Sequence, residues 1–93
     1  MEFDLLLGDV RSLKQKRSAV RPLIAELQRR FAVSAAETGA QDLHRRANVG
    51  MAVVAADRGH VVDVLDAAER LVASRPEIEL LSAHRGLRRS IDD

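Results

Sequence analysis

Four stretches of the chain have the short apolar runs or the apolar–polar alternation that is typical of β-strands. They cover residues 2–7, 32–37, 49–54 and 78–83. A connection that opens at Gly39 joins the second stretch to the third. The positions predicted to face the core are Phe3, Leu5, Leu7, Val33, Ala35, Val49, Met51, Val53, Ile78, Leu80 and Ser82.

Two longer stretches repeat apolar residues at the spacing that places them on one face of an α-helix. The first begins after Ser12, and Ser12 with Gln15 has the spacing of a capping box. Pro22 lies inside this stretch and lacks a backbone donor, so we expect a bend or a restart there. The second begins after Asp57, which is placed to cap it, and Pro76 stops it. The apolar faces comprise Leu13, Val20, Ile24, Leu27 and Phe31, then Val61, Val64, Leu65, Ala68, Leu71 and Val72.

The resulting order is β-α-β-β-α-β. Short antiparallel connections combined with right-handed crossovers predict a ferredoxin-like two-layer sandwich of the α+β class, in which both helices cover one face of the sheet. The expected strand order is 4-1-3-2. We expect one domain over residues 1–85 and a frayed tail over residues 86–93.

Charge is distributed unevenly at the start of the first helix. Residues 10–25 carry five cations and no carboxylate, although cations near a helix N-terminus are unfavourable. The predicted topology brings the hairpin between the second and third strands, and Arg75, to the same end of the sheet. With a net charge of only +1, attraction to nucleic acid needs such a local basic pole. Its predicted members are Arg11, Lys14, Lys16, Arg17, Arg21, His44, Arg45 and Arg46.

Two segments, RSLKQKRSAVRPL and VSAAETGAQDLHRRANVG, resemble the YlxP-like family of small bacterial domains with no assigned function. Ala40 and His44 depart from the family pattern, which commonly has histidine and tryptophan there. The resemblance implies a ferredoxin-like fold, and the genomic neighbourhood of such genes, near translation factors, favours an RNA or ribosome connection. The matching positions are Ser12, Leu13, Lys14, Lys16 and Arg17, then Ala36, Glu37, Gly39, Gln41, Asp42, Leu43, Arg46 and Ala47.

Composition narrows the chemistry further. The absence of cysteine excludes disulfides and thiolate metal sites, and the three histidines lack ligand spacing, so we expect no metal and no cofactor. Phe3 and Phe31, the only aromatic residues, belong to the predicted core, which excludes RNA recognition by stacking on the sheet. Glu37 and Asp42 could form a general-base pair, but a loop Asp and a strand-end Glu more often cap a turn and pair with an Arg. No membrane span and no signal peptide are evident, so we expect a cytoplasmic protein.

The leading hypothesis is a non-enzymatic protein that binds RNA or ribosomal phosphates through the basic pole. A second hypothesis is a homodimer formed through the open sheet face, with Leu6, Val54 and Leu81 at its interface, because most positions predicted for that face are apolar. A third is a small phosphoryl or acyl-phosphate hydrolase, which would need a glycine-rich phosphate loop beyond the lone Gly8. The positions predicted for the open face are Asp4, Leu6, Ser34, Ala36, Ala52, Val54, Leu81 and Ala83.

Overall fold

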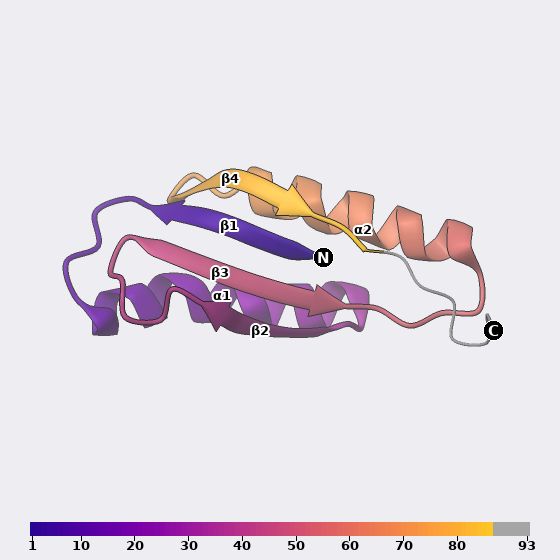
Figure 1. The fold of residues 1–93 in the computed structure, drawn as a ribbon, viewed down its shortest axis with the longest axis horizontal. Coiled ribbons are helices and arrows are strands. Elements are labelled where there is room, and N and C mark those ends of the chain that lie inside the picture. The colour runs from indigo at the N-terminus through magenta and orange to yellow at the C-terminus, as the bar shows by residue number, and fades with distance from the viewer. Residues whose placement is uncertain (87–93) are drawn as a thin grey trace.

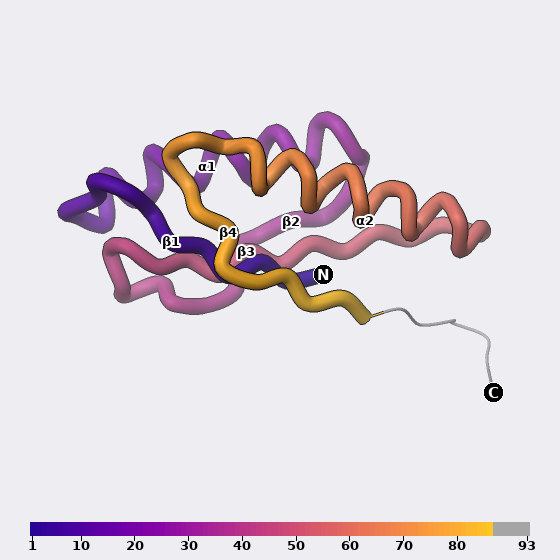
Figure 2. Tube along the Cα trace, turned by 90° about the horizontal axis from the view of Figure 1, so that it is seen from above, coloured from indigo at the N-terminus to yellow at the C-terminus, as the bar shows by residue number. Residues whose placement is uncertain are grey.

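The computed structural model describes residues 1–86, so the predicted tail beyond Gly86 lies outside the described residues. The sheet is antiparallel in the order β2-β3-β1-β4, and both helices lie on the same side of it (Figures 1 and 2). This confirms the predicted ferredoxin-like arrangement. The elements are β1 (Glu2–Leu7), α1 (Leu13–Phe31), β2 (Ser34–Gly39), β3 (Arg46–Ala52), α2 (Arg58–Ala73) and β4 (Ile78–His84).

The core fills the space between the sheet and the two helices. The three inward residues predicted for β1 are fully buried, because alternate side chains of a strand point to the same face. The helical faces close over them, with Leu23 added to the predicted face of α1. Burial of this apolar surface is the main favourable contribution to folding. The core residues are Phe3, Leu5, Leu7, Val20, Leu23, Leu27, Val33, Ala47, Val49, Met51, Val64, Leu65, Ala68, Val72 and Ile78.

A capping box starts α1 at the predicted place. The Gln15 backbone N–H donates to Ser12 Oγ at 3.1 Å, and the Gln15 side chain accepts from the Arg11 N–H at 2.6 Å. One backbone donor that the helix leaves free, the Gln15 N–H, is thereby satisfied, and the reaching side chain bonds the residue before the N-cap rather than Ser12 itself. The expected restart at Pro22 does not occur, since the helix continues through this exposed residue as one element.

The strands β2 and β3 begin at other residues than predicted. β2 begins at Ser34, two residues later than predicted, and β3 begins at Arg46, three residues earlier. The start of β3 was missed because Arg46 and Asn48 are polar, yet both lie on the face that carries no helices, where polar side chains are normal.

An irregularity in β4 reverses the facing that we predicted for its second half. The register of β1 against β4 shifts between Asp4 and Leu5, and leaves Leu81 as an extra residue on β4. Asp4 therefore pairs with Ser82 on the open face, and Ala83 packs against the core. The prediction that Ser82 faces inward and Ala83 outward was wrong, because one inserted residue reverses the alternation of all that follow.

The open sheet face carries paired polar side chains among its apolar ones, which corrects the prediction that most of its positions are apolar. Arg46 Nη2 donates to both carboxylate oxygens of Asp4, at 2.8 and 2.7 Å, and Thr38 Oγ1 lies 2.6 Å from Glu2 Oε2. Val54 lies beyond the end of β3 and is 97% exposed. Within residues 1–86 the open face is therefore less apolar than the dimer hypothesis assumed, although Leu81 is 41% exposed, and self-association stays an untested prediction.

Candidate nucleic-acid interface

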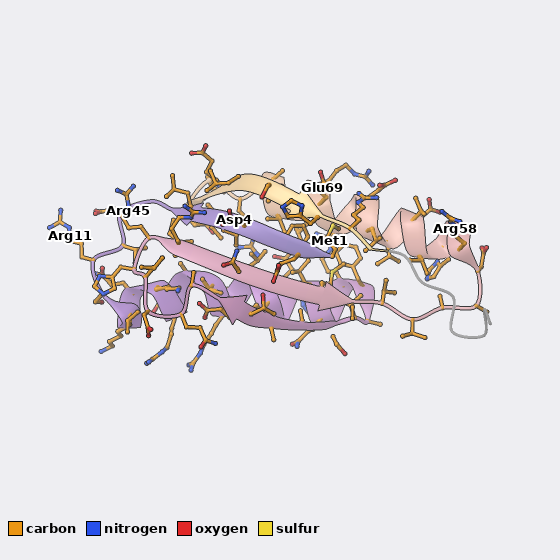
Figure 3. The ribbon with its side chains drawn as sticks, in the orientation of Figure 1. Met1, Asp4, Arg11, Arg45, Arg58 and Glu69 are labelled. Atoms are coloured by element: carbon orange, nitrogen blue, oxygen red, sulfur yellow. The ribbon has the colours of Figure 1, made fainter. Side chains whose placement is uncertain are left out.

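Three connections meet at the end of the sheet where β1 terminates (Figure 1). They are the segment from β1 to α1, the loop between β2 and β3, and the turn between α2 and β4. Arg45 Nε donates to the carbonyl oxygens of Leu7 and Gly8, at 3.3 and 3.2 Å, which ties the β2–β3 loop to the end of β1. Arg11 and Arg45 both lie at this end (Figure 3). The predicted meeting of the two basic segments is therefore confirmed.

Six cations of the described chain have acidic partners, and four of them are less exposed than Arg11 and Arg30, which pair with Asp9 and Glu26 at 3.4 Å. Arg46 pairs with Leu6 of β1 and so lies at the predicted end of the sheet. Its side chain, however, binds Asp4 on the open face of the sheet. Hydrogen bonds first to Asp66 and then to Glu69 raise the pKa of Arg85 above its usual value. The ion pairs of these four less exposed cations are Lys16 with Glu37, Arg46 with Asp4, Arg75 with Glu26 and Glu77, and Arg85 with Asp66 and Glu69.

Three exposed cations in the first half of α1 form a different group. Lys14, Arg17 and Arg21 are exposed, and within residues 1–86 none of them forms an ion pair. Their spacings of three and four residues place them along one side of the helix. Like charges at these spacings repel by about 0.2–0.5 kcal/mol per pair. This surface is therefore electrostatically unsatisfied within the described chain. We call Lys14, Arg17 and Arg21 the α1 cation stripe.

Lys16 does not belong to that stripe, contrary to the predicted binding set. Its side chain is 2% exposed, and its Nζ donates to the Ala40 carbonyl at 2.6 Å and lies 2.8 Å from Glu37 Oε2. A phosphate cannot reach it. The signal for this burial was present in the sequence, because Lys16 precedes Val20 by four residues and Leu23 by seven, and so lies on the buried face of α1.

The Lys16–Glu37 pair lies beside a polar cleft of about 300 Å³ between α1 and the β2–β3 loop. Glu37 pairs with a lysine rather than with the expected Arg. The cleft joins the two motifs that carry the family resemblance, since each contributes three of its lining residues. These are Leu13, Lys16 and Arg17 from the first motif, and Glu37, Gln41 and Asp42 from the second.

The three histidines lie on different elements. His44 lies in the β2–β3 loop, His60 in α2 and His84 in β4. Residues 1–86 contain no group of three acidic, histidine or cysteine side chains arranged to hold a metal ion. Within the same residues, no helix has the length and hydrophobicity needed to cross a membrane.

The motif residue Gly39 packs closely against β3, since an added Cβ would lie 3.1 Å from Asn48 Oδ1.

Comparison with known proteins gives a family and no activity. The family described as "Protein of unknown function (DUF503)" matches residues 1–85. The chain is also 33% identical over 78 residues to the uncharacterized protein YlxP of Bacillus subtilis, an alignment that covers 84% of this chain and 85% of that protein. The expected resemblance to YlxP-like proteins is thereby confirmed.

Proposed function

This chain belongs to the DUF503 family, and we propose that it is a non-enzymatic protein that binds the phosphate backbone of RNA through the α1 cation stripe. The observation that supports this proposal is the distribution of paired and unpaired cations within the described chain. Lys16, Arg46, Arg75 and Arg85 have acidic partners, as do the more exposed Arg11 and Arg30, whereas the stripe has none. Arg29, Arg58 and Arg70 also lack an acidic partner within residues 1–86, but the stripe places three such cations within two turns of one helix.

The position of the stripe supports an anionic ligand. Free backbone N–H groups and the positive end of the helix dipole both favour an anion at a helix N-terminus. The first turn of α1 contains no acidic residue. Arg11 adds a further cation before the helix, although Asp9 lies 3.4 Å from it in an exposed pair that contributes little.

The proposal gives a quantitative expectation for salt. If three to four phosphates of a single strand are neutralised, log K falls by about 0.7 per phosphate for each tenfold rise in salt. Affinity should therefore fall by roughly 20- to 50-fold between 50 and 200 mM salt. Fluorescence anisotropy with a labelled single-stranded RNA measures this slope directly.

A pair of charge reversals locates the binding surface. Lys14→Glu with Arg17→Glu should weaken binding by at least about tenfold and flatten the salt slope, because two phosphate contacts are lost. Acidic residues are favourable in the first turns of a helix, so this variant should fold. The matched control, Arg58→Glu with Arg70→Glu, makes the same change in net charge on α2, where both residues are exposed.

If the proposal is right, the stripe variant loses RNA affinity and the control variant does not. The control should retain the wild-type salt slope. Equal losses in both variants would mean that overall charge, and not the stripe, attracts RNA. Salt-independent binding by the wild-type protein would contradict the proposal as well.

A further inference from the structure

The cleft beside the stripe differs from it in charge. Its lining contains two cations, Lys16 and Arg17, and two carboxylates, Glu37 and Asp42. Another phosphate would be repelled by the carboxylates there. A polar group without net charge, which offers both donors and acceptors, fits this lining better.

Two side chains of the cleft, Gln41 and Asp42, have no partner within the described chain, and a third, Glu37, has Lys16 alone. Glu37 Oε2 is buried and takes no hydrogen bond from any group of residues 1–86 besides its contact with Lys16 Nζ. The side chains of Gln41 and Asp42 are exposed, and none of the hydrogen bonds or ion pairs within residues 1–86 involves them. Carboxylates only accept hydrogen bonds, so the ligand must present donors to them, and the Gln41 amide can take either role.

A nucleobase edge is the group of this kind that an RNA carries next to its phosphates. Proteins read unstacked bases of single strands by hydrogen bonds to their Watson–Crick edges. Among the four bases, guanine presents two adjacent donors, N1–H and the 2-amino group, which match the two oxygens of one carboxylate. Its O6 acceptor suits Arg17 or Gln41.

We propose that the cleft binds the Watson–Crick edge of an unpaired guanine, with Asp42 accepting from its two donors while the α1 cation stripe holds the flanking phosphates. This inference rests on the RNA-binding function proposed above. Lys16 is a positioning residue here, because its bond to the Ala40 carbonyl fixes the loop that carries Gln41 and Asp42.

Four labelled RNAs test the inference in the anisotropy assay: an all-uridine strand and the same strand with one central guanosine, inosine or adenosine. Inosine lacks only the 2-amino group of guanosine. We expect the guanosine strand to bind at least about fivefold more tightly than the inosine and adenosine strands, the lower end of what a bidentate base contact supplies. Free guanosine monophosphate should compete weakly, because it lacks the flanking phosphates.

The variant Asp42→Asn should abolish the preference for guanosine and leave binding to the uridine strand at least as strong as before. Asp63→Asn is the control, because this exposed residue of α2 changes the net charge equally and lies outside the cleft. It should keep the preference.

The outcomes separate the two proposals. Salt-dependent binding that does not distinguish guanosine from inosine, or a preference that survives in Asp42→Asn, would overturn the guanine site alone. If free guanosine monophosphate competes tightly, the cleft binds a free nucleotide without the flanking phosphates, and the proposal of an RNA-bound guanine is overturned. Failure of the wild-type protein to bind any of the four strands would overturn the RNA-binding function and this site with it.

Discussion

Replacement of the buried Lys16 by methionine is the most informative test of how the interface is held together. The substitution keeps a long flexible side chain in the core and removes the charge. It deletes one hydrogen bond, to the Ala40 carbonyl, and one ion pair, to Glu37. Both partners belong to the segment from β2 to the following loop, so the change releases that segment from α1.

The cost follows from the burial of the two partners. A hydrogen bond to a charged group contributes about 1.5–3 kcal/mol, and removal of one partner from a buried ion pair costs about 3–5 kcal/mol in total. Glu37 retains 23% of its side-chain exposure, so water compensates part of its lost pairing. We therefore expect Lys16→Met to lower the free energy of unfolding by about 3 kcal/mol. In a domain of this size that corresponds to a fall in Tm of roughly 12–24 °C.

Urea denaturation of four proteins checks this reasoning: wild type, Lys16→Met, Glu37→Met and the double variant. Replacement of a whole buried ion pair by apolar residues is often neutral, because the desolvation cost of both charges disappears. The double variant should therefore lie within about 1 kcal/mol of the wild type. If the double variant is as unstable as the sum of the single variants, the two charges are not coupled and the reasoning fails.

Two further predictions concern backbone geometry. Ala32 ends α1 in the left-handed conformation, at φ 52°, where glycine is favoured, so Ala32→Gly should raise the free energy of unfolding by up to about 1 kcal/mol in the same urea assay. A Cβ at Gly50 would lie 2.6 Å from Cγ2 of Thr38, so this exposed side chain must turn and lose its hydrogen bond to Glu2. Gly50→Ala should therefore lower the free energy of unfolding by about 0.5–1.5 kcal/mol. Thr38→Ser removes that methyl group and should restore most of the loss; an unchanged loss would show that the clash is elsewhere.

The element order and the core could be predicted because they depend on local periodicity. Alternation in β1, the helical repeat of α2 and the capping box at Ser12 are properties of neighbouring residues. The meeting of Arg11 with Arg45 followed from topology alone, because the connection order decides which loops share an end of the sheet.

The missed features depend on partners that are distant in sequence. The extra residue at Leu81 exists only in the pairing of β4 with β1, so no pattern within β4 reveals it. Lys16 was assigned to the surface by residue type, although its position was that of a core residue. Its burial is possible because Glu37 and Ala40 lie across from it, more than twenty residues along the chain, and an isolated sequence does not show that compensation.

A buried ion pair is a costly way to fill space in a domain of 93 residues, and its position suggests what it contributes. An apolar pair would pack the same volume but would not require the Ala40 carbonyl at a fixed place. Because Lys16 requires it, the loop that carries Gln41 and Asp42 is held against the helix that carries Arg17. The doubly apolar variant separates these roles. If it keeps its stability and its salt-dependent affinity but loses the preference for guanosine, the ion pair serves the geometry of the cleft rather than the stability of the fold.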